Sequence, residues 1–371
     1  MSITVKEVAQ KILNHEDVFI LDIRKEEDFS DWAINGKNVS SVNVPFKKLE
    51  QDFDEVKDQF PADQPVYVVC AKGISSQKAV DFLHEKGLTE ATYVEGGMTA
   101  WSEHLEPVKV GNLSDGGELY QFIRIGKGCL SYMVIANGEA AVIDPVRMTD
   151  TFKSFADEKK VSIQYVFDTH LHADHISGGR TLASEAGADY YFPSKEDEGV
   201  SFEYKDVQDG TTVKVGNSVE ISAFYSPGHT IGSTSYIVDE QYLLTGDILF
   251  IESIGRPDLA GKADAWVSDL RDTLYERYKK LADDLVVLPA HFGEMKEIND
   301  DGTVKDTIKN IYEKNDRLQV DSEEEFKSLV TDNLPPQPNS HEEIRKTNMG
   351  QKNPEEVERR EMEVGPNRCA V

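Results

Sequence analysis

One stretch of potential metal ligands constrains the fold of this chain most: VSIQYVFDTHLHADHISGG, residues 161–179. The β-branched and aromatic run at 163–167 predicts a short buried strand, and a helical pattern follows at 180–186. Between them lie His170, His172, Asp174 and His175. Open α/β sheets place their sites on loops beyond the carboxyl ends of strands, and transition metals prefer imidazole and carboxylate ligands. The stretch therefore predicts a metal site on a strand-to-helix loop.

Three later segments present the same kinds of residue after strand-like runs. His229 lies in YSPGHT, Asp247 ends QYLLTGD and His291 ends VVLPAH. The ordered pattern H-x-H-x-D-H, then H, D and H, resembles that of the metallo-β-lactamase superfamily from about Gln121 to the tail. This resemblance implies an αββα sandwich with the metal at one edge.

The amino-terminal part predicts a separate α/β domain built around a cysteine. A strand pattern at 65–69 delivers Cys70 at its carboxyl end, and a helix is expected over 76–86. A cysteine in this position faces backbone N–H groups and the positive end of a helix dipole, which both stabilise a thiolate. The sequence therefore predicts a reactive thiol.

This part also resembles the rhodanese family over residues 2–101. The matching pieces are LDIR at 21–24, Gly36 with VNVP at 42–45, Cys70-x-x-Gly73, and EGGMTAW at 95–101. The resemblance implies that Cys70 carries sulfane sulfur as a persulfide and that Lys72, Gly73 and Ser75 bind the substrate. Ala71 and Ser75 stand where many members have Arg, so Lys72 is the one positive charge left in the loop, and sulfite or thiosulfate binding is expected to be weaker.

The domain bounds follow from these resemblances and from turn residues between them. We expect a rhodanese domain at 1–105, a linker at 106–117 rich in Gly and Pro, and a metallo-β-lactamase-fold domain with a tail at 118–371. Cys129 is expected to be a core thiol, and Cys369, near the carboxyl end, to have no function.

Composition excludes some classes of partner. The net charge of −28 argues against nonspecific binding to nucleic acid or to an anionic membrane. No apolar run approaches the roughly 18 residues of a membrane span, and the amino terminus lacks a signal-peptide core. We therefore expect a cytoplasmic protein, and a homo-oligomer, either a dimer or a tetramer.

The ligand types alone leave the reaction open. Two zinc ions could hydrolyse a thioester with a metal-bound hydroxide, as the hydroxyacylglutathione hydrolases of the superfamily do. Alternatively, His170, His229 and Asp247 would form the two-His, one-carboxylate face that leaves positions open on a single Fe(II). A third alternative is a sulfur-relay or sensing module without enzymatic activity.

Two observations favour iron. A sulfur-carrying rhodanese shares substrate and product with a persulfide oxidase, but shares no intermediate with a hydrolase of lactoyl thioesters. In addition, THLHADHISG at 169–178, SPGHT at 226–230, IGRPD at 254–258 and NLP at 333–335 resemble the persulfide dioxygenase family.

The resemblance implies one Fe(II) per chain, held by His170, His229 and Asp247. Arg256 would anchor the substrate, and the remaining candidates would orient ligands or meet substrate and solvent: His172, Asp174, His175 and His291. The implied reaction oxidises a low-molecular-weight thiol persulfide with O₂ to sulfite and thiol. The rhodanese domain would exchange sulfur between persulfide, sulfite and thiosulfate.

Overall fold

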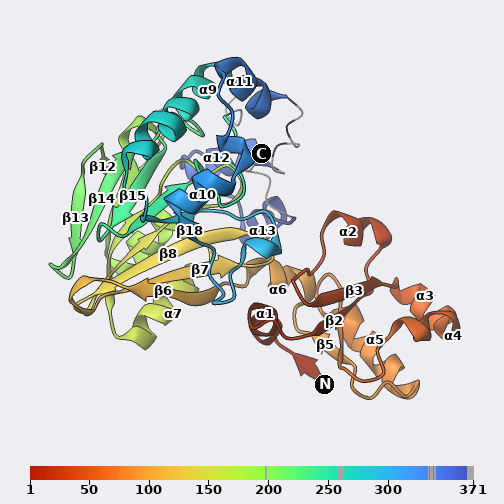
Figure 1. Cartoon of the computed structure of the whole chain (residues 1–371). Helices are drawn as coiled ribbons and strands as arrows, with labels where there is room; N and C mark the ends of the chain where they lie inside the picture. Colours follow the sequence, from red (N-terminus) through yellow and green to blue (C-terminus); the bar gives the residue numbers. More distant parts are fainter. Residues whose placement is uncertain (197–198, 258–262, 333, 335–336, 338–339, 366–371) are drawn as a thin grey trace.

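The computed structural model describes residues 1–196, 199–257, 263–332, 334, 337 and 340–365, which form two domains (Figure 1). Cys369 lies outside the described residues. The amino-terminal domain has a parallel sheet in the order β1 (Ser2–Ile3), β5 (Thr92–Val94), β4 (Val66–Val69), β2 (Val18–Asp22) and β3 (Val39–Asn43). Helix α5 (Ile74–Glu85) packs on one face, and α1 (Val5–Leu13) and α6 (Gly97–Glu103) pack on the other. The expected α/β domain is confirmed.

The second domain is a sandwich of two mixed sheets. The seven-stranded sheet runs β12 (Lys205–Val207), β11 (Asp189–Pro193), β10 (Ser162–Phe167), β9 (Glu139–Ile143), β8 (Cys129–Ala136), β7 (Glu118–Arg124) and β6 (Glu106–Asn112). The six-stranded sheet runs β13 (Thr212–Val215), β14 (Val219–Tyr225), β15 (Thr234–Val238), β16 (Tyr242–Gly246), β17 (Val286–Pro289) and β18 (Asp306–Thr307).

Apolar residues fill three layers of this sandwich. One core lies between the sheets and includes Ile123, Tyr236 and Leu288. The outer face of the seven-stranded sheet packs on α7 (Thr149–Lys159) and α8 (Gly179–Ala186). The outer face of the other sheet packs on α9 (Ala263–Asp272), α10 (Ile308–Lys314) and α11 (Glu323–Thr331). Helices α9 and α11 lie above the strands in Figure 1. The αββα architecture is therefore confirmed.

Strand direction brings the predicted ligands to one edge. β16 and β17 are parallel neighbours, so Asp247, after β16, and His291, after β17, emerge side by side. β10 delivers the 168–178 loop, and β14 delivers the loop that carries His229. Parallel strands place their carboxyl ends together, which is why segments far apart in the sequence meet here.

The expected linker at 106–117 is wrong for its first half. Glu106–Asn112 is β6, which pairs antiparallel with β7 as the edge strand of the seven-stranded sheet. An edge strand tolerates Pro107, and Gly111 lies where the register shifts, so residues typical of a linker occur here inside a strand. The domain bounds 1–105 and 118–371 stay predictions.

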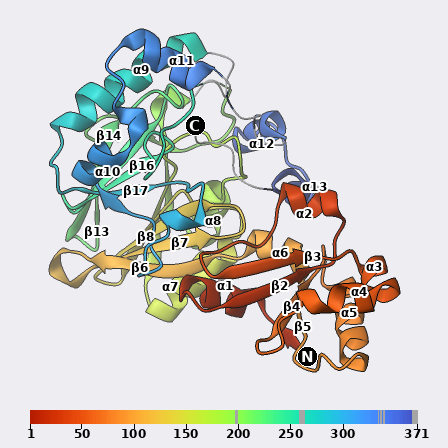
Figure 2. The ribbon, with the colours of Figure 1, turned by 45° about the vertical axis from the view of Figure 1, so that its right-hand side comes forward.

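The carboxyl-terminal part contains more structure than its polar sequence indicates. Apolar residues recur at helical spacing over 303–318, but Asp306–Thr307 pairs with β17 as β18, and α10 starts only after it. Two further helices follow, α12 (His341–Asn348) and α13 (Glu356–Met362). In Figure 2 they lie on the side of the sandwich that faces the amino-terminal domain. No helix among the described residues is long and apolar enough to cross a membrane.

Candidate functional site

The loop around Cys70 is shaped to hold a sulfur anion. The backbone N–H of Ser76 donates to Cys70 Sγ at 3.4 Å, and the Ser76 hydroxyl lies 3.4 Å from the same atom. Burial raises the pKa of Cys70, but these bonds and those from the Lys72 and Gly73 amides outweigh it, so the pKa lies below its usual range. Lys72 and Ser75 are exposed at the mouth of the loop.

Helix α6 closes the other side of this loop. The Met98 amide donates to Cys70 O at 2.9 Å. Gly97 has φ 57°, and a Cβ on it would lie 2.1 Å from Cys70 O. Only glycine therefore permits this close approach.

At the edge of the sandwich, three of the predicted ligands converge. Asp247 Oδ2 lies 3.7 Å from His170 Nε2 and 3.6 Å from His229 Nε2. All three side chains are buried, and His170 Nε2 and Asp247 Oδ2 have no hydrogen-bond partner among the described residues. Donors that bind one ion at about 2.1 Å stand roughly 3 to 3.6 Å apart. The group therefore fits a metal ion.

Each of these three side chains is oriented by a hydrogen bond through the polar atom that does not point at the shared metal position. His170 Nδ1 donates to Thr169 Oγ1 at 2.9 Å, and Thr169 donates onward to Asp144 Oδ2 at 2.9 Å. His229 Nδ1 donates to the Arg256 carbonyl at 2.8 Å. Asp247 Oδ1 accepts from His291 Nδ1 at 2.6 Å. Such outer contacts set the tautomer and leave the second donor atom for a metal.

The pKa shifts of the same three side chains favour the protonation states that bind a metal. Burial, together with the neighbouring His172, holds the pKa of His170 well below its usual range, and burial lowers the pKa of His229. Burial raises the pKa of Asp247, but His291, His170 and His229 outweigh it and hold that pKa well below its usual range. Neutral imidazoles and an ionised carboxylate are the forms that bind metals.

His172 lies next to this group, with its ring centre 4.2 Å from that of His170, and its Nδ1 has no hydrogen-bond partner among the described residues. Its Nε2 donates to Asp144 Oδ1 at 3.2 Å, within a second buried cluster that includes Asp168. Asp144 has φ 50°, a left-handed conformation that is uncommon for a residue with a side chain, and it also accepts from the Thr169 amide at 2.6 Å. The backbone there is thus held in an unfavourable conformation where it orients the metal loop.

A third cluster joins the remaining candidates. Asp174 accepts from His175 Nδ1 at 3.1 Å and pairs with His291 Nε2 at 2.9 Å, and Cys129 Sγ lies 3.9 Å from Asp174 Oδ2. Burial lowers the pKa of His175, but Asp174 outweighs it and raises that pKa to about 10. The pKa of His291 is likewise raised well above its usual value by Asp247 and Asp174, against burial. Opposite charges therefore hold these side chains together, while His175 Nε2 has no hydrogen-bond partner among the described residues.

Cys129 is buried, as expected of a core thiol, but it also belongs to this cluster. Burial raises its pKa, while His291 and His175 outweigh burial and lower the pKa to about 6. Sequence reasoning missed this placement because it arises from the β-bridge between Cys129 and His291, which are far apart in the chain.

Sequence reasoning also missed four buried residues that hold the metal loops: Asp144, Glu196, Asn348 and Glu363. Asp144 directly follows β9, the same signal that identified Asp247, and could have been found. Glu196 accepts from the Leu171 amide at 3.4 Å and from the Thr230 hydroxyl, and so joins two of the loops. No local pattern marks Asn348 or Glu363.

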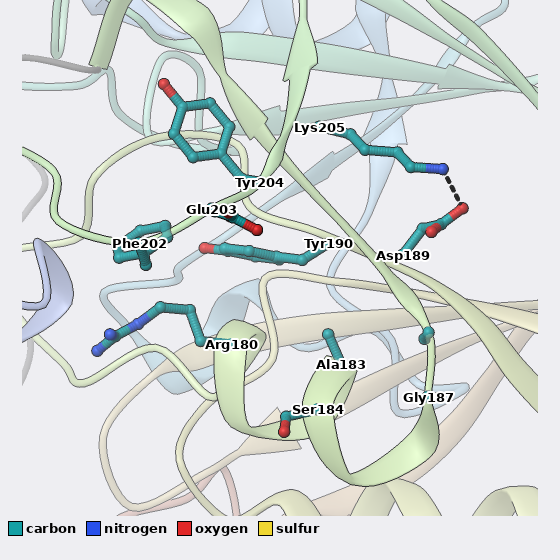
Figure 3. Close-up of a pocket in the computed structure, with 11 residues that line it drawn as sticks. Arg180, Ala183, Ser184, Gly187, Asp189, Tyr190, Phe202, Glu203, Tyr204 and Lys205 are labelled. Carbon is teal, nitrogen blue, oxygen red and sulfur yellow. Dashed lines mark hydrogen bonds and ion pairs between the residues drawn. The ribbon is translucent and has the colours of Figure 1, made fainter.

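A surface cavity of about 650 Å³ lies elsewhere, beside α8, β11 and β12 (Figure 3). Arg180, Phe202 and Tyr204 line it, and the Arg180 guanidinium lies 4.6 Å from the centre of the Phe202 ring. The predicted site residues do not line this cavity. Arg256, the predicted substrate anchor, is buried beside His229, and its role stays a prediction.

Comparison with known families matches both domains. Residues 4–104 match the model of the rhodanese-like domain, and residues 124–291 match that of the metallo-beta-lactamase superfamily. A thiosulfate sulfurtransferase, GlpE of Pseudoalteromonas translucida, is 35% identical over 24% of this chain and 79% of its own length.

Relatives of the second domain have different activities. Human mitochondrial persulfide dioxygenase ETHE1 is 30% identical over 53% of this chain and 73% of its own length. A hydroxyacylglutathione hydrolase of Polaromonas is 32% identical over 42% of this chain, which spans only 57% of that hydrolase. The crystal structure of ETHE1 from Myxococcus xanthus superposes with a TM-score of 0.56 at 26% identity, covering 63% of this chain and 99% of that one.

Proposed function

Because the chain belongs to the metallo-beta-lactamase superfamily and carries a rhodanese-like domain ahead of that fold, we propose that it is a persulfide dioxygenase with sulfurtransferase activity. One persulfide, one O₂ and one water would give one thiol, one sulfite and protons, with the terminal sulfur oxidised and O₂ reduced. The second product, sulfite, would accept sulfur from a persulfide on Cys70 to give thiosulfate.

The number of converging donors carries this proposal. Two imidazoles and one carboxylate, from His170, His229 and Asp247, share one point. His172 lies beside them and pairs with Asp144 through Nε2, while its Nδ1 has no hydrogen-bond partner among the described residues. A two-His, one-carboxylate face is typical of Fe(II) sites that bind O₂. Iron, when bound there, would supply the redox chemistry and leave positions open for O₂ and a persulfide sulfur.

The protein's own residues would hold and orient this centre. Thr169 and the Arg256 carbonyl fix the two imidazole rings, and His291 fixes the Asp247 carboxylate. Because His291 donates from Nδ1 to Asp247, it keeps the other carboxylate oxygen free for the metal. Arg256 would bind a substrate carboxylate, since its guanidinium forms charge-assisted hydrogen bonds.

A binuclear zinc thioesterase is the alternative, and one observation favours it. Asp174, His175 and His291 lie in a second cluster of donors that could hold another ion, and a hydroxyacylglutathione hydrolase is among the relatives. Asp174 pairs with both histidines of this cluster, and His175 Nε2 has no hydrogen-bond partner among the described residues.

Metal analysis combined with oxygen uptake tests the proposal. Protein purified without added metal should contain about one iron per chain and consume O₂ with the persulfide of glutathione, coenzyme A or bacillithiol. Sulfite should appear as O₂ is consumed. Two zinc ions per chain, hydrolysis of lactoyl thioesters and no oxygen uptake with any of the three persulfides would instead establish the hydrolase.

A further inference from the structure

The carboxyl-terminal segment returns to the loop that carries the metal ligands. Asn348, the last residue of α12, is 6% exposed. Its side-chain amide donates to the carbonyls of His172 and His175, both at 2.9 Å, and its oxygen accepts from the Ser177 amide at 3.0 Å. One side chain therefore holds three backbone groups of the loop.

Glu363, just after α13, contacts the same loop from a second direction. One carboxylate oxygen accepts from the Ile176 amide at 2.6 Å. The other pairs with Arg147 at 2.7 Å and with Arg124 at 3.1 Å. The side chain is 1% exposed, and although burial raises its pKa, Arg124, Arg147 and Lys127 outweigh burial and lower the pKa to about 2. A charged carboxylate is thus held against the loop.

We propose that Asn348 and Glu363 are positioning residues of the metal site, so that the carboxyl-terminal segment is part of that site. A loop without regular structure must be fixed by contacts outside itself. Asn348 fixes the backbone at His172 and His175, and these contacts hold the segment in which His172 faces Asp144 and His175 faces Asp174. The segment thereby helps to decide which donors face the metal.

The segment is also anchored on the amino-terminal domain. Arg360, on α13, donates to Glu103 of α6 at 2.6 Å, and Arg147, the partner of Glu363, pairs with Glu103 as well. Arg124 donates to the Ser102 carbonyl at 2.5 Å. The Glu363 carboxylate therefore lies between the metal loop and the helix that closes the Cys70 loop.

The inference rests on one part of the proposed function, the metal at His170, His229 and Asp247. It does not depend on which reaction that metal catalyses. Cobalt(II), which has a visible spectrum sensitive to its ligands, is a suitable probe. Metal-free full-length protein would be titrated with Co(II) against a competing chelator, and the spectrum recorded. Direct outer contacts of metal ligands typically change metal affinity by about 10- to 100-fold. Asn348 and Glu363 act one step further out, through the backbone of the loop that carries His170, so the lower end of that range is expected.

Asn348→Asp is the sharpest variant, because it keeps the size and the acceptor but replaces the donor to two carbonyls with a carboxylate. We expect the Co(II) affinity to fall by about tenfold and the visible spectrum to change. Thr347→Val is the matched control: it removes the neighbouring hydroxyl bond to the Glu343 carbonyl within α12 and leaves the loop contacts intact. It should lower the thermal stability but leave the Co(II) affinity and spectrum unchanged.

Glu363→Gln provides an independent test if the first variant fails to fold. It removes the charge that pairs with Arg124 and Arg147, and should also weaken Co(II) binding, whereas Glu356→Gln, at an exposed partner of Arg147, should not. If Asn348→Asp keeps the wild-type Co(II) affinity and spectrum, the inference is overturned but the proposed metal site is not. If Asn348→Asp does not fold, the same result in Glu363→Gln overturns the inference. Absence of Co(II) binding by the wild-type protein would overturn the inference together with the proposed metal site.

Discussion

At the scale of single residues, the two carboxylate oxygens of Asp247 have different contacts, which predict different effects for mutation of Asp247 and of His291. One carboxylate oxygen has no partner among the described residues and faces two imidazoles, while the other accepts from His291. Asp247→Ala should remove most of the bound iron and abolish oxygen uptake, because it deletes a donor. His291→Ala should lower the rate while most of the iron is retained. Iron content and oxygen uptake measured on the same samples check this, and equal iron loss in both variants would make His291 a ligand.

The Ser76 hydroxyl predicts a pH effect at Cys70. It is one of the groups that lower the pKa of the thiol, so Ser76→Ala should raise that pKa. The thiolate, which is the reactive form, exists above the pKa, so the rate of alkylation should rise with pH at higher values in the variant than in the wild type. Alkylation of Cys70 by iodoacetamide, followed by mass spectrometry of its peptide, measures this. Coincident pH profiles would show that the hydroxyl does not set the pKa.

At the scale of elements, the contact between α6 and the Cys70 loop depends on a missing side chain. Gly97→Ala would place a Cβ 2.1 Å from Cys70 O and must displace the loop. We expect loss of thiosulfate formation with the iron content unchanged. Gly87→Ala is the control, because Gly87 also has positive φ, 95°, but nothing lies within 4 Å of its Cβ position. It should cost only about 1–2 kcal/mol in unfolding free energy and leave the activity intact. Full activity in Gly97→Ala would mean that the loop accommodates the methyl group.

At the scale of the whole molecule, the two sites predict separable chemistry. The iron site needs no protein thiol, since the substrate brings its own sulfur, whereas sulfur transfer needs the Cys70 thiolate. Cys70→Ser should therefore keep oxygen uptake and sulfite release but lose thiosulfate formation from persulfide and sulfite. One reaction followed for O₂, sulfite and thiosulfate decides it. Equal thiosulfate in both proteins would rule out Cys70 as the carrier, and collapsed oxygen uptake in a folded, iron-replete variant would show that the sites depend on each other.

Two further predictions concern the whole molecule, its oligomeric state and its location. The homo-oligomer, either a dimer or a tetramer, and the cytoplasmic location stay predictions. Analytical ultracentrifugation of the full chain measures the first directly.

The sequence by itself determined the strand ends on which Cys70, His170, His229 and Asp247 lie, because these depend on local patterns, apolar runs ending in polar residues, which the chain carries whatever its surroundings. The fold classes of the two domains followed from the resemblance of their motifs to two families. The tertiary structure decided how the candidates divide: His172 pairs with Asp144, and His175 with Asp174, because neighbouring segments supply those partners. It also placed the first half of the expected linker in strand β6, since an edge strand accepts Pro and Gly. The roles of Asn348 and Glu363 could not be predicted from the local sequence, which is simply polar. They follow from the buried backbone groups of a distant loop, which require hydrogen-bond partners.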